Sequence, residues 1–239
     1  DMLLCREARA QRQSALIREY NAPVVCFTMN IPGEIKYTPL IGLAFEDGVR
    51  RLETALMRPA AKVINTSFTG CEAFFVFPCS ATEAKSAAVR VEENDAVARL
   101  YDIDVIDVNG TKLTRSGERR CIVCGGPVTA CARSRAHGLG EITAAADALM
   151  RDFAAKKLAR LAAGALTDEL RTTPKPGLVD LVNNGAHKDM DKDTFYASIR
   201  ALEPFFESMA RIAFEKSAFA PENMMEALRD CGMAAERAM

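Results

Sequence analysis

The stretch AFFVFPCSATEAKSAAVRV, residues 73–91, contains a strand signal and a helix signal separated by a short turn. Residues 73–77 are all apolar and are followed by Pro78, which is typical of a buried strand. Ser80 followed by Glu83 forms a capping-box pattern, so a helix is expected to begin there. The sequence therefore predicts a buried strand that leads directly into a helix.

The flanking segments continue this alternation of strands and helices. Apolar or alternating runs predict strands, and apolar residues at helical spacing predict the helix between the first two of them. Asn109-Gly110 predicts a tight hairpin between a strand at 97–108 and a strand at 111–115. A further amphipathic helix is expected near the N-terminus, around residues 3–16. The predicted segments are strands at 23–29, 62–68, 97–108 and 111–115, and a helix at 40–56.

The order β-α-β-β-α-β predicts an α+β domain, similar to ferredoxin-like folds, with helices on one face of a mainly antiparallel sheet. No strand signal follows residue 140, where an Ala-rich helical stretch runs from residue 141 to about residue 171. The segment 174–177, Pro-Lys-Pro-Gly, stops that helix because proline cannot continue one. We therefore expect an α+β domain over residues 1–154, including a Cys/His loop, and an all-α segment over residues 155–239.

The overall composition restricts the functional class. The 239 residues carry 31 basic and 32 acidic side chains, so the net charge is -1. This balance argues against a general nucleic-acid binder and against a polybasic membrane anchor. No apolar run approaches the roughly 18 residues of a membrane span. Eight cysteines in a chain with long helices favour free thiols over a disulfide scaffold, and hence a cytoplasmic protein.

The first candidate site is the acidic pair in RLYDIDV, residues 99–105. On a strand, Asp102 and Asp104 point to the same face, about 7 Å apart along the backbone. Two neighbouring carboxylates repel each other unless a cation or hydrogen bonds compensate them. Mg²⁺ held jointly with substrate phosphates would provide that compensation. The alternative is a solvated strand face that carries two aspartates.

The second candidate site is a cluster of Cys121, Cys124, Cys131 and His137. Three thiolates and one imidazole satisfy a closed tetrahedral zinc site, and the Cys-x2-Cys spacing is that of a metal knuckle. A set of free cysteines and a redox pair are the alternatives, because the later spacings depart from common zinc-binding patterns. The same loop is rich in arginine, which suits an anionic ligand. These arginines are Arg115, Arg119, Arg120, Arg133 and Arg135.

The third candidate site is a Gly/Pro-rich loop over residues 172–191. It gathers several ionisable groups between two helical stretches. Its spacing alone indicates only a structured polar loop, in which an aspartate could cap the next helix. The candidate residues are Lys175, Asp180, His187, Asp189 and Asp191.

Over residues 3–152 the chain resembles the apo-citrate lyase phosphoribosyl-dephospho-CoA transferase family. The matching motifs are PVVCFT at 23–28, PGEIK at 32–36, RLYDIDV at 99–105 and the whole pattern from Cys121 to His137, including CAR at 131–133. Residues 155–239 look like the start of the triphosphoribosyl-dephospho-CoA synthase family, through TPKPGLVD at 173–180 and NGAHKDMD at 184–191. The two families act consecutively, so the chain resembles a bifunctional fusion with an incomplete second domain.

The resemblance implies two transfer reactions. The synthase joins ATP to dephospho-CoA and expels adenine. The transferase then passes the phosphoribosyl-dephospho-CoA group to a serine of the citrate lyase acyl carrier protein and releases pyrophosphate. On this basis Asp102 and Asp104 are expected to hold Mg²⁺ as catalytic residues, with Arg99 and Arg133 binding the triphosphate.

The resemblance also assigns the candidates of the 172–191 loop to ATP or Mg²⁺ contacts. Structural zinc in the Cys/His cluster is expected from its donor set and spacing, because the resemblance alone does not establish a metal. A competing reading is a non-enzymatic zinc-loop adaptor that docks an acyl carrier protein through its arginines. The same-face aspartate pair disfavours an adaptor for an acidic partner. A nucleic-acid zinc module is disfavoured by the neutral charge and by the absence of aromatic residues in the loop.

Overall fold

The computed structural model describes residues 2–172 of the protein. The chain divides into two compact units, Asp1–Met150 and Arg151–Met239. The first unit contains four strands: β1 (Val24–Met29), β2 (Ala61–Ser67), β3 (Gly70–Val76) and β4 (Tyr101–Ile106). They form one sheet in the order β2-β3-β1-β4, and each pair of neighbours is antiparallel. This confirms the predicted antiparallel sheet.

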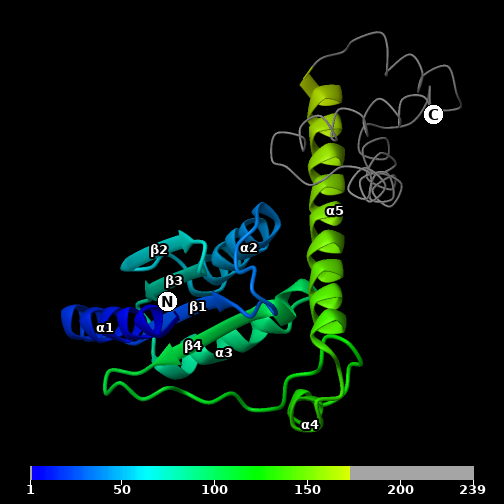
Figure 1. The fold of residues 1–239 in the computed structure, drawn as a ribbon. Coiled ribbons are helices and arrows are strands. Elements are labelled where there is room, and N and C mark those ends of the chain that lie inside the picture. The colour runs from blue at the N-terminus through cyan, green and yellow to red at the C-terminus, as the bar shows by residue number, and fades with distance from the viewer. Residues whose placement is uncertain (1, 173–239) are drawn as a thin grey trace, which may run out of the picture. The chain divides into compact units, whose positions relative to one another are not determined.

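Helices α2 (Pro39–Leu56) and α3 (Ala81–Glu92) occupy the two predicted positions between the strands, which completes the β-α-β-β-α-β order (Figure 1). Helix α2 begins at Thr38, whose hydroxyl accepts a hydrogen bond from the N–H of Ile41. The capping box of Ser80 and Glu83 is present at the start of α3. Side chains at helix ends therefore set both helix starts.

One face of the sheet packs against α2 around a buried aromatic cluster. Phe27 of β1 stacks on Phe45 of α2 with ring centroids 4.9 Å apart, and it meets Tyr101 of β4 edge-on at 5.2 Å. Gly48 of α2 lies against the Phe27 ring, where even a Cβ atom would be too close. The absence of a side chain at Gly48 lets the helix and the sheet approach each other.

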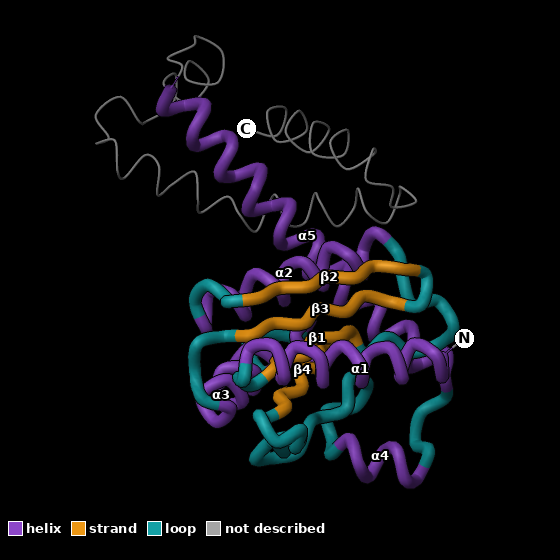
Figure 2. The backbone as a smooth tube through the Cα atoms, turned by 90° about the vertical axis from the view of Figure 1, so that its left-hand side faces the viewer, coloured by secondary structure: helices purple, strands orange, loops and turns teal. Residues whose placement is uncertain are grey.

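Helix α1 (Met2–Tyr20) lies on the opposite face of the sheet, which the prediction of helices on one face did not include (Figure 2). Leu16 of α1 is buried with Val24 and Cys26 of β1 and with Phe74 of β3. The side chain of Arg9 also donates to Glu72 of β3 at 2.9 Å. The sheet is therefore apolar on both faces and needs a helix layer on each.

The last strand is shorter than the predicted span of residues 97–108. Residues Val97–Leu100 form a 3-10 turn, η1, because Asp95 accepts a hydrogen bond from the N–H of Ala98 at 3.0 Å. The predicted turn at Asn109-Gly110 is present, with Gly110 at φ +80. The predicted strand 111–115 is reduced to an isolated bridge between Ile106 and Lys112, so that part of the prediction was wrong.

After the sheet, a long loop leads to α4 (Val128–Ser134) and then to α5 (Leu139–Thr172). Within residues 2–172, no helix is both long and apolar enough to cross a membrane. The predicted all-α segment is helical over the described part, residues 155–172, and its remaining predictions lie outside the described residues.

Candidate functional site

The first half of the Cys/His cluster is a tight turn in the loop after β4. The backbone N–H of Gly125 donates to the carbonyl of Cys121 at 3.0 Å, and the N–H of Cys121 donates to the carbonyl of Gly126 at 2.7 Å. Gly125 has φ +73, a backbone conformation that glycine adopts without steric cost. This turn places Cys121 and Cys124 in the cluster.

The second half of the cluster comes from α4 and the residues that follow it. Cys131 lies in α4, and its Sγ is 3.5 Å from Sγ of Cys124. His137 follows the helix, and its Nε2 is 3.3 Å from the same Cys124 sulfur. All four ligand atoms lie within 4.8 Å of one another. Tetrahedral zinc with bonds of about 2.3 Å separates its sulfurs by roughly 3.8 Å, so the cluster could hold a metal ion.

The thiols of the cluster differ in acidity. The backbone N–H of Cys124 lowers the pKa of Cys121 to about 7. The Cys124 side chain raises the pKa of Cys131 to about 11 through a hydrogen bond. Thiolates are the metal-binding form of cysteine, so Cys121 is more readily available as a ligand than Cys131.

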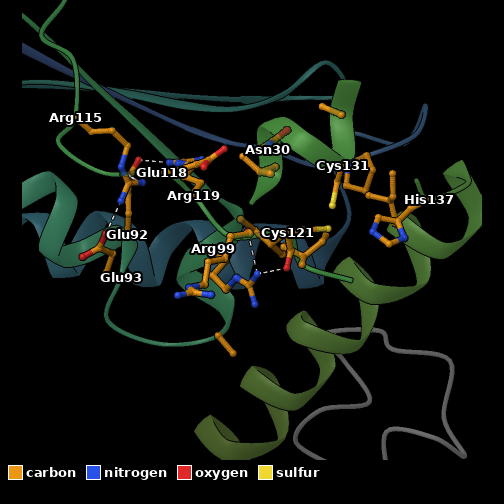
Figure 3. Close-up of a pocket in the computed structure, with 18 of the residues that line it drawn as sticks. Asn30, Glu92, Glu93, Arg99, Arg115, Glu118, Arg119, Cys121, Cys131 and His137 are labelled. Atoms are coloured by element: carbon orange, nitrogen blue, oxygen red, sulfur yellow. Dashed lines mark hydrogen bonds and ion pairs between the residues drawn. The ribbon is translucent and has the colours of Figure 1, made fainter. Parts of the chain in front are cut away.

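A cavity of about 770 Å³ lies beside the cluster, within the first unit (Figure 3). Figure 3 shows Cys131 and His137 at one end of it and the group of Arg115, Arg119 and Glu92 at the other. The cavity wall combines arginines and aliphatic side chains with four carboxylates, Glu92, Glu93, Asp95 and Glu118, each of which has a hydrogen-bond or ion-pair partner. The arginines are Arg99, Arg115, Arg119, Arg120 and Arg135, and the larger aliphatic residues are Leu100, Ile122, Val128, Leu139 and Ile142.

Three of these arginines have no carboxylate partner among the described residues. Arg99 donates to the carbonyl of Arg120 at 2.9 Å and to the carbonyl of Cys121. Arg120 donates to the carbonyl of Gly125 at 3.2 Å. Arg135 makes no ion pair within the described part of the chain. Guanidinium groups that lack a carboxylate partner leave the cavity suited to an anion.

The other two arginines are held by Glu92 at the end of α3. The Glu92 side chain is only 3% exposed and accepts from the N–H of Ile103 at 2.8 Å. It pairs with Arg119 and, at 3.4 Å, with Arg115. Burial raises the pKa of Glu92, while Arg119 acts in the opposite direction. A buried carboxylate with two guanidinium partners fixes this wall of the cavity.

Sequence reasoning missed Glu92, although a signal was present. Glu92 lies four residues after Ala88 and eight after Ala84, in register with the apolar face of the helix. A carboxylate at such a position is buried with its helix face and requires a cationic partner.

Asp102 and Asp104 lie on the same face of β4, as predicted, and are 48% and 28% exposed. Both are close to a cation: Lys112 lies 2.6 Å from Asp104, and Arg119 lies 3.7 Å from Asp102. The pair lines a smaller pocket of about 510 Å³. That pocket shares Glu92, Arg115 and Arg119 with the larger cavity, so the two pockets are neighbours.

The remaining predicted site residues have different positions. Arg99 lines the larger cavity, as predicted for a phosphate-binding residue. Arg133 is exposed on α4 and does not line the cavity, whereas Arg135, two residues later, lines it. The candidates in the 172–191 loop lie outside the described residues. These are Lys175, Asp180, His187, Asp189 and Asp191.

Comparison with protein families agrees with these motifs. Residues 1–153 match the family model described as apo-citrate lyase phosphoribosyl-dephospho-CoA transferase. The chain belongs to this family. Residues 155–239 match a second family model, described as ATP:dephospho-CoA triphosphoribosyl transferase. The arginine cavity, the aspartate pair and the Cys/His cluster all lie in the part that matches the first family.

Two relatives that match nearly all of this chain carry the name Protein CitXG, and a third is named as a transferase alone. It is 35% identical to "Protein CitXG" of Haemophilus influenzae over 100% of this chain and 53% of the relative. It is 29% identical to "Protein CitXG" of Leuconostoc mesenteroides subsp. cremoris over 98% of this chain and 54% of the relative. A probable apo-citrate lyase phosphoribosyl-dephospho-CoA transferase of Vibrio cholerae is 32% identical over 64% of this chain and 90% of its own length. The chain therefore spans about half the length of the CitXG relatives.

Proposed function

We propose that residues 1–154 form a transferase domain that moves the phosphoribosyl-dephospho-CoA group from triphosphoribosyl-dephospho-CoA to a serine of the citrate lyase acyl carrier protein. The serine oxygen attacks the α-phosphorus, and a new P–O bond forms. The bond from that phosphorus to the pyrophosphate breaks, and the serine proton leaves to a base or to solvent. We place this reaction in the cytoplasm.

The cavity lined by Arg99, Arg120 and Arg135 is the observation that carries the proposal. These three guanidinium groups have no carboxylate partner in the described part of the chain, and each can donate to phosphate oxygens. Pyrophosphate is a good leaving group only when its charge is neutralised. A site with several arginines that lack a carboxylate partner is suited to that task.

We further propose that Asp102 and Asp104 bind Mg²⁺ together with the substrate phosphates. Mg²⁺ typically takes one or two carboxylates plus phosphate oxygens, and it would neutralise charge on the triphosphate. Arg119 lies between the pair and the larger cavity, since it is 3.7 Å from Asp102 and also lines that cavity. In this arrangement Lys112 competes with the metal ion for Asp104.

We propose that residues 155–239 belong to the enzyme that makes the donor from ATP and dephospho-CoA with release of adenine. The support is the match of this segment to the second family model. The residues carried over as ATP or Mg²⁺ contacts are Lys175, Asp180, His187, Asp189 and Asp191.

Intact mass spectrometry of the apo acyl carrier protein tests the transferase proposal. The protein is incubated with this chain, Mg²⁺ and triphosphoribosyl-dephospho-CoA. We expect a mass gain equal to one phosphoribosyl-dephospho-CoA group. No gain with a folded chain that still binds the acyl carrier protein would contradict the proposal and favour the adaptor.

Arg135→Gln is expected to lower kcat/KM for transfer, mainly by raising the KM for the donor. One charge-assisted contact to phosphate is worth about 1.5–3 kcal/mol, which corresponds to roughly 10- to 150-fold. Arg58→Gln is the matched control, because Arg58 is exposed in the loop after α2 and does not line the cavity. Equal effects of the two variants on KM would show that Arg135 acts only through net charge.

The Cys/His cluster is proposed to bind structural zinc through Cys121, Cys124, Cys131 and His137. Elemental analysis of the reduced protein is expected to find about one zinc per chain. Cys124→Ser should reduce this content to near zero, since Cys124 contacts both Cys131 and His137. Cys79→Ser is the control, because Cys79 is a free cysteine outside the cluster. Reduced wild-type protein without zinc would disprove the assignment.

A further inference from the structure

The larger cavity has an apolar rim that the proposed phosphate contacts do not use. Val128 at the start of α4 is 36% exposed, and Leu139 at the start of α5 is 62% exposed. Ile142 lies one helical turn after Leu139, on the same side of α5. All three side chains line the cavity. Aliphatic side chains exposed together at the mouth of a cavity are typical of a ligand-binding surface.

The size of the cavity also points to a ligand larger than a phosphate chain. Pockets of roughly 300–1,000 Å³ enclose drug-sized ligands. The cavity, at about 770 Å³, lies in the upper part of that range and exceeds what an inorganic triphosphate would fill. Its arginines and its aliphatic side chains are therefore suited to two different parts of one molecule.

We infer that Val128, Leu139 and Ile142 form a subsite for the nucleoside part of a ligand whose phosphates contact Arg99, Arg120 and Arg135. The inference rests on the proposed function for the identity of the donor, in which ribose rings connect the triphosphate to adenine. No Phe, Tyr or Trp is among the described residues that line the cavity, and the imidazole that does line it, His137, belongs to the Cys/His cluster. The base is therefore packed by aliphatic side chains and not stacked on a ring.

The aliphatic rim and the arginines make separable contributions to binding. Aliphatic contacts act on the nucleoside and are absent when the ligand is a bare phosphate chain. Burying the apolar surface of two such side chains is worth enough to change affinity by about 10-fold. Inorganic triphosphate, in contrast, contacts only the charged groups.

Isothermal titration of the full chain with ATP and with inorganic triphosphate tests the subsite. In the double variant Val128→Ser/Leu139→Ser we expect the Kd for ATP to rise about 10-fold, while the Kd for inorganic triphosphate stays within about twofold. Any ATP site in residues 155–239 contributes equally to every variant, so the difference between variants reports on the cavity.

The matched control is Ile64→Ser/Val108→Ser, which removes two aliphatic side chains that are 46% and 44% exposed and lie outside the cavity. It should leave both affinities unchanged. A loss shared equally by the two probes, or no loss for either, would overturn the subsite. Wild-type protein that binds neither ATP nor inorganic triphosphate would also overturn it.

If wild type binds ATP but not inorganic triphosphate, and the rim variant still weakens ATP, the subsite stands. In that case the proposed role of the arginines in triphosphate binding fails instead. The mass-spectrometric assay reports independently on transfer, so a subsite without transfer activity would leave the inference intact and remove the proposed function.

Discussion

The double variant Asp102→Asn/Asp104→Asn is expected to transfer the prosthetic group about a thousandfold more slowly than wild type. Binding of a metal ion to a transferring phosphate is worth several kcal/mol, and each 1.36 kcal/mol is about tenfold in rate. Asparagine keeps the shape of aspartate but lacks the charge that holds Mg²⁺. The measurement is the initial rate of mass gain on the acyl carrier protein at saturating Mg²⁺.

The fold of this variant should be intact, because the two side chains are 48% and 28% exposed and are not part of the core. Its thermal midpoint is the control and is expected to change by only a few degrees. Lys112→Gln gives a second readout, since Lys112 lies 2.6 Å from Asp104. Removing that competitor should lower the Mg²⁺ concentration needed for half-maximal rate. A double variant that retains a tenth of the wild-type rate would exclude the metal role.

Gly48→Ala is expected to destabilise the first unit by about 3 kcal/mol or more. A Cβ atom at this position would lie 2.6 Å from Cε1 of Phe27 and even closer to its Cζ. Phe27 is fully buried and stacks on Phe45, so its ring cannot move aside without disturbing the aromatic cluster. The expected drop in thermal midpoint is roughly 10 °C, measured by circular dichroism.

Gly140→Ala is the matched control for this prediction. Gly140 lies in the first turn of α5, and an added Cβ would meet nothing within 4 Å. Alanine favours helix over glycine by up to about 1 kcal/mol, so this variant should be as stable as wild type or slightly more stable. If Gly48→Ala were as stable as Gly140→Ala, the close packing of α2 on the sheet would be refuted.

Much of the fold was predictable because it depends on local signals. The apolar run before Pro78 and the capping box at Ser80 and Glu83 specify a strand and a helix within a few residues of each other. The same holds for the turn at Gly110, where the backbone adopts a positive φ. The exact start of β4 was missed, because the 3-10 turn before it, in which the N–H of Ala98 donates to the Asp95 side chain, is not revealed by the apolar pattern.

Some features of the candidate site were also predictable from local sequence, and others were not. The spacing of Cys121 and Cys124 is a local property of one turn, and the sequence predicted a metal knuckle there. The alternation of Asp102 and Asp104 is a local property of a strand, so their common face was also predictable. Which arginines reach the cavity was not predictable, because Arg133 lies in α4 and Arg135 in the left-handed turn that ends it, and only the fold decides which of the two lines the cavity.

The sequence by itself determined the order of the strands and helices that build the sheet domain, the turn at Asn109-Gly110 and the residues of the Cys/His cluster, whereas α4 was not predicted. These features depend on periodicity, capping and spacing over short stretches. Only the tertiary structure decided that Glu92 holds two arginines from a loop more than twenty residues away, and that side chains of α4 and α5 line the same cavity as Arg99. Contacts between distant segments arise from how the sheet, its helices and the loop pack together, and no local pattern encodes that packing.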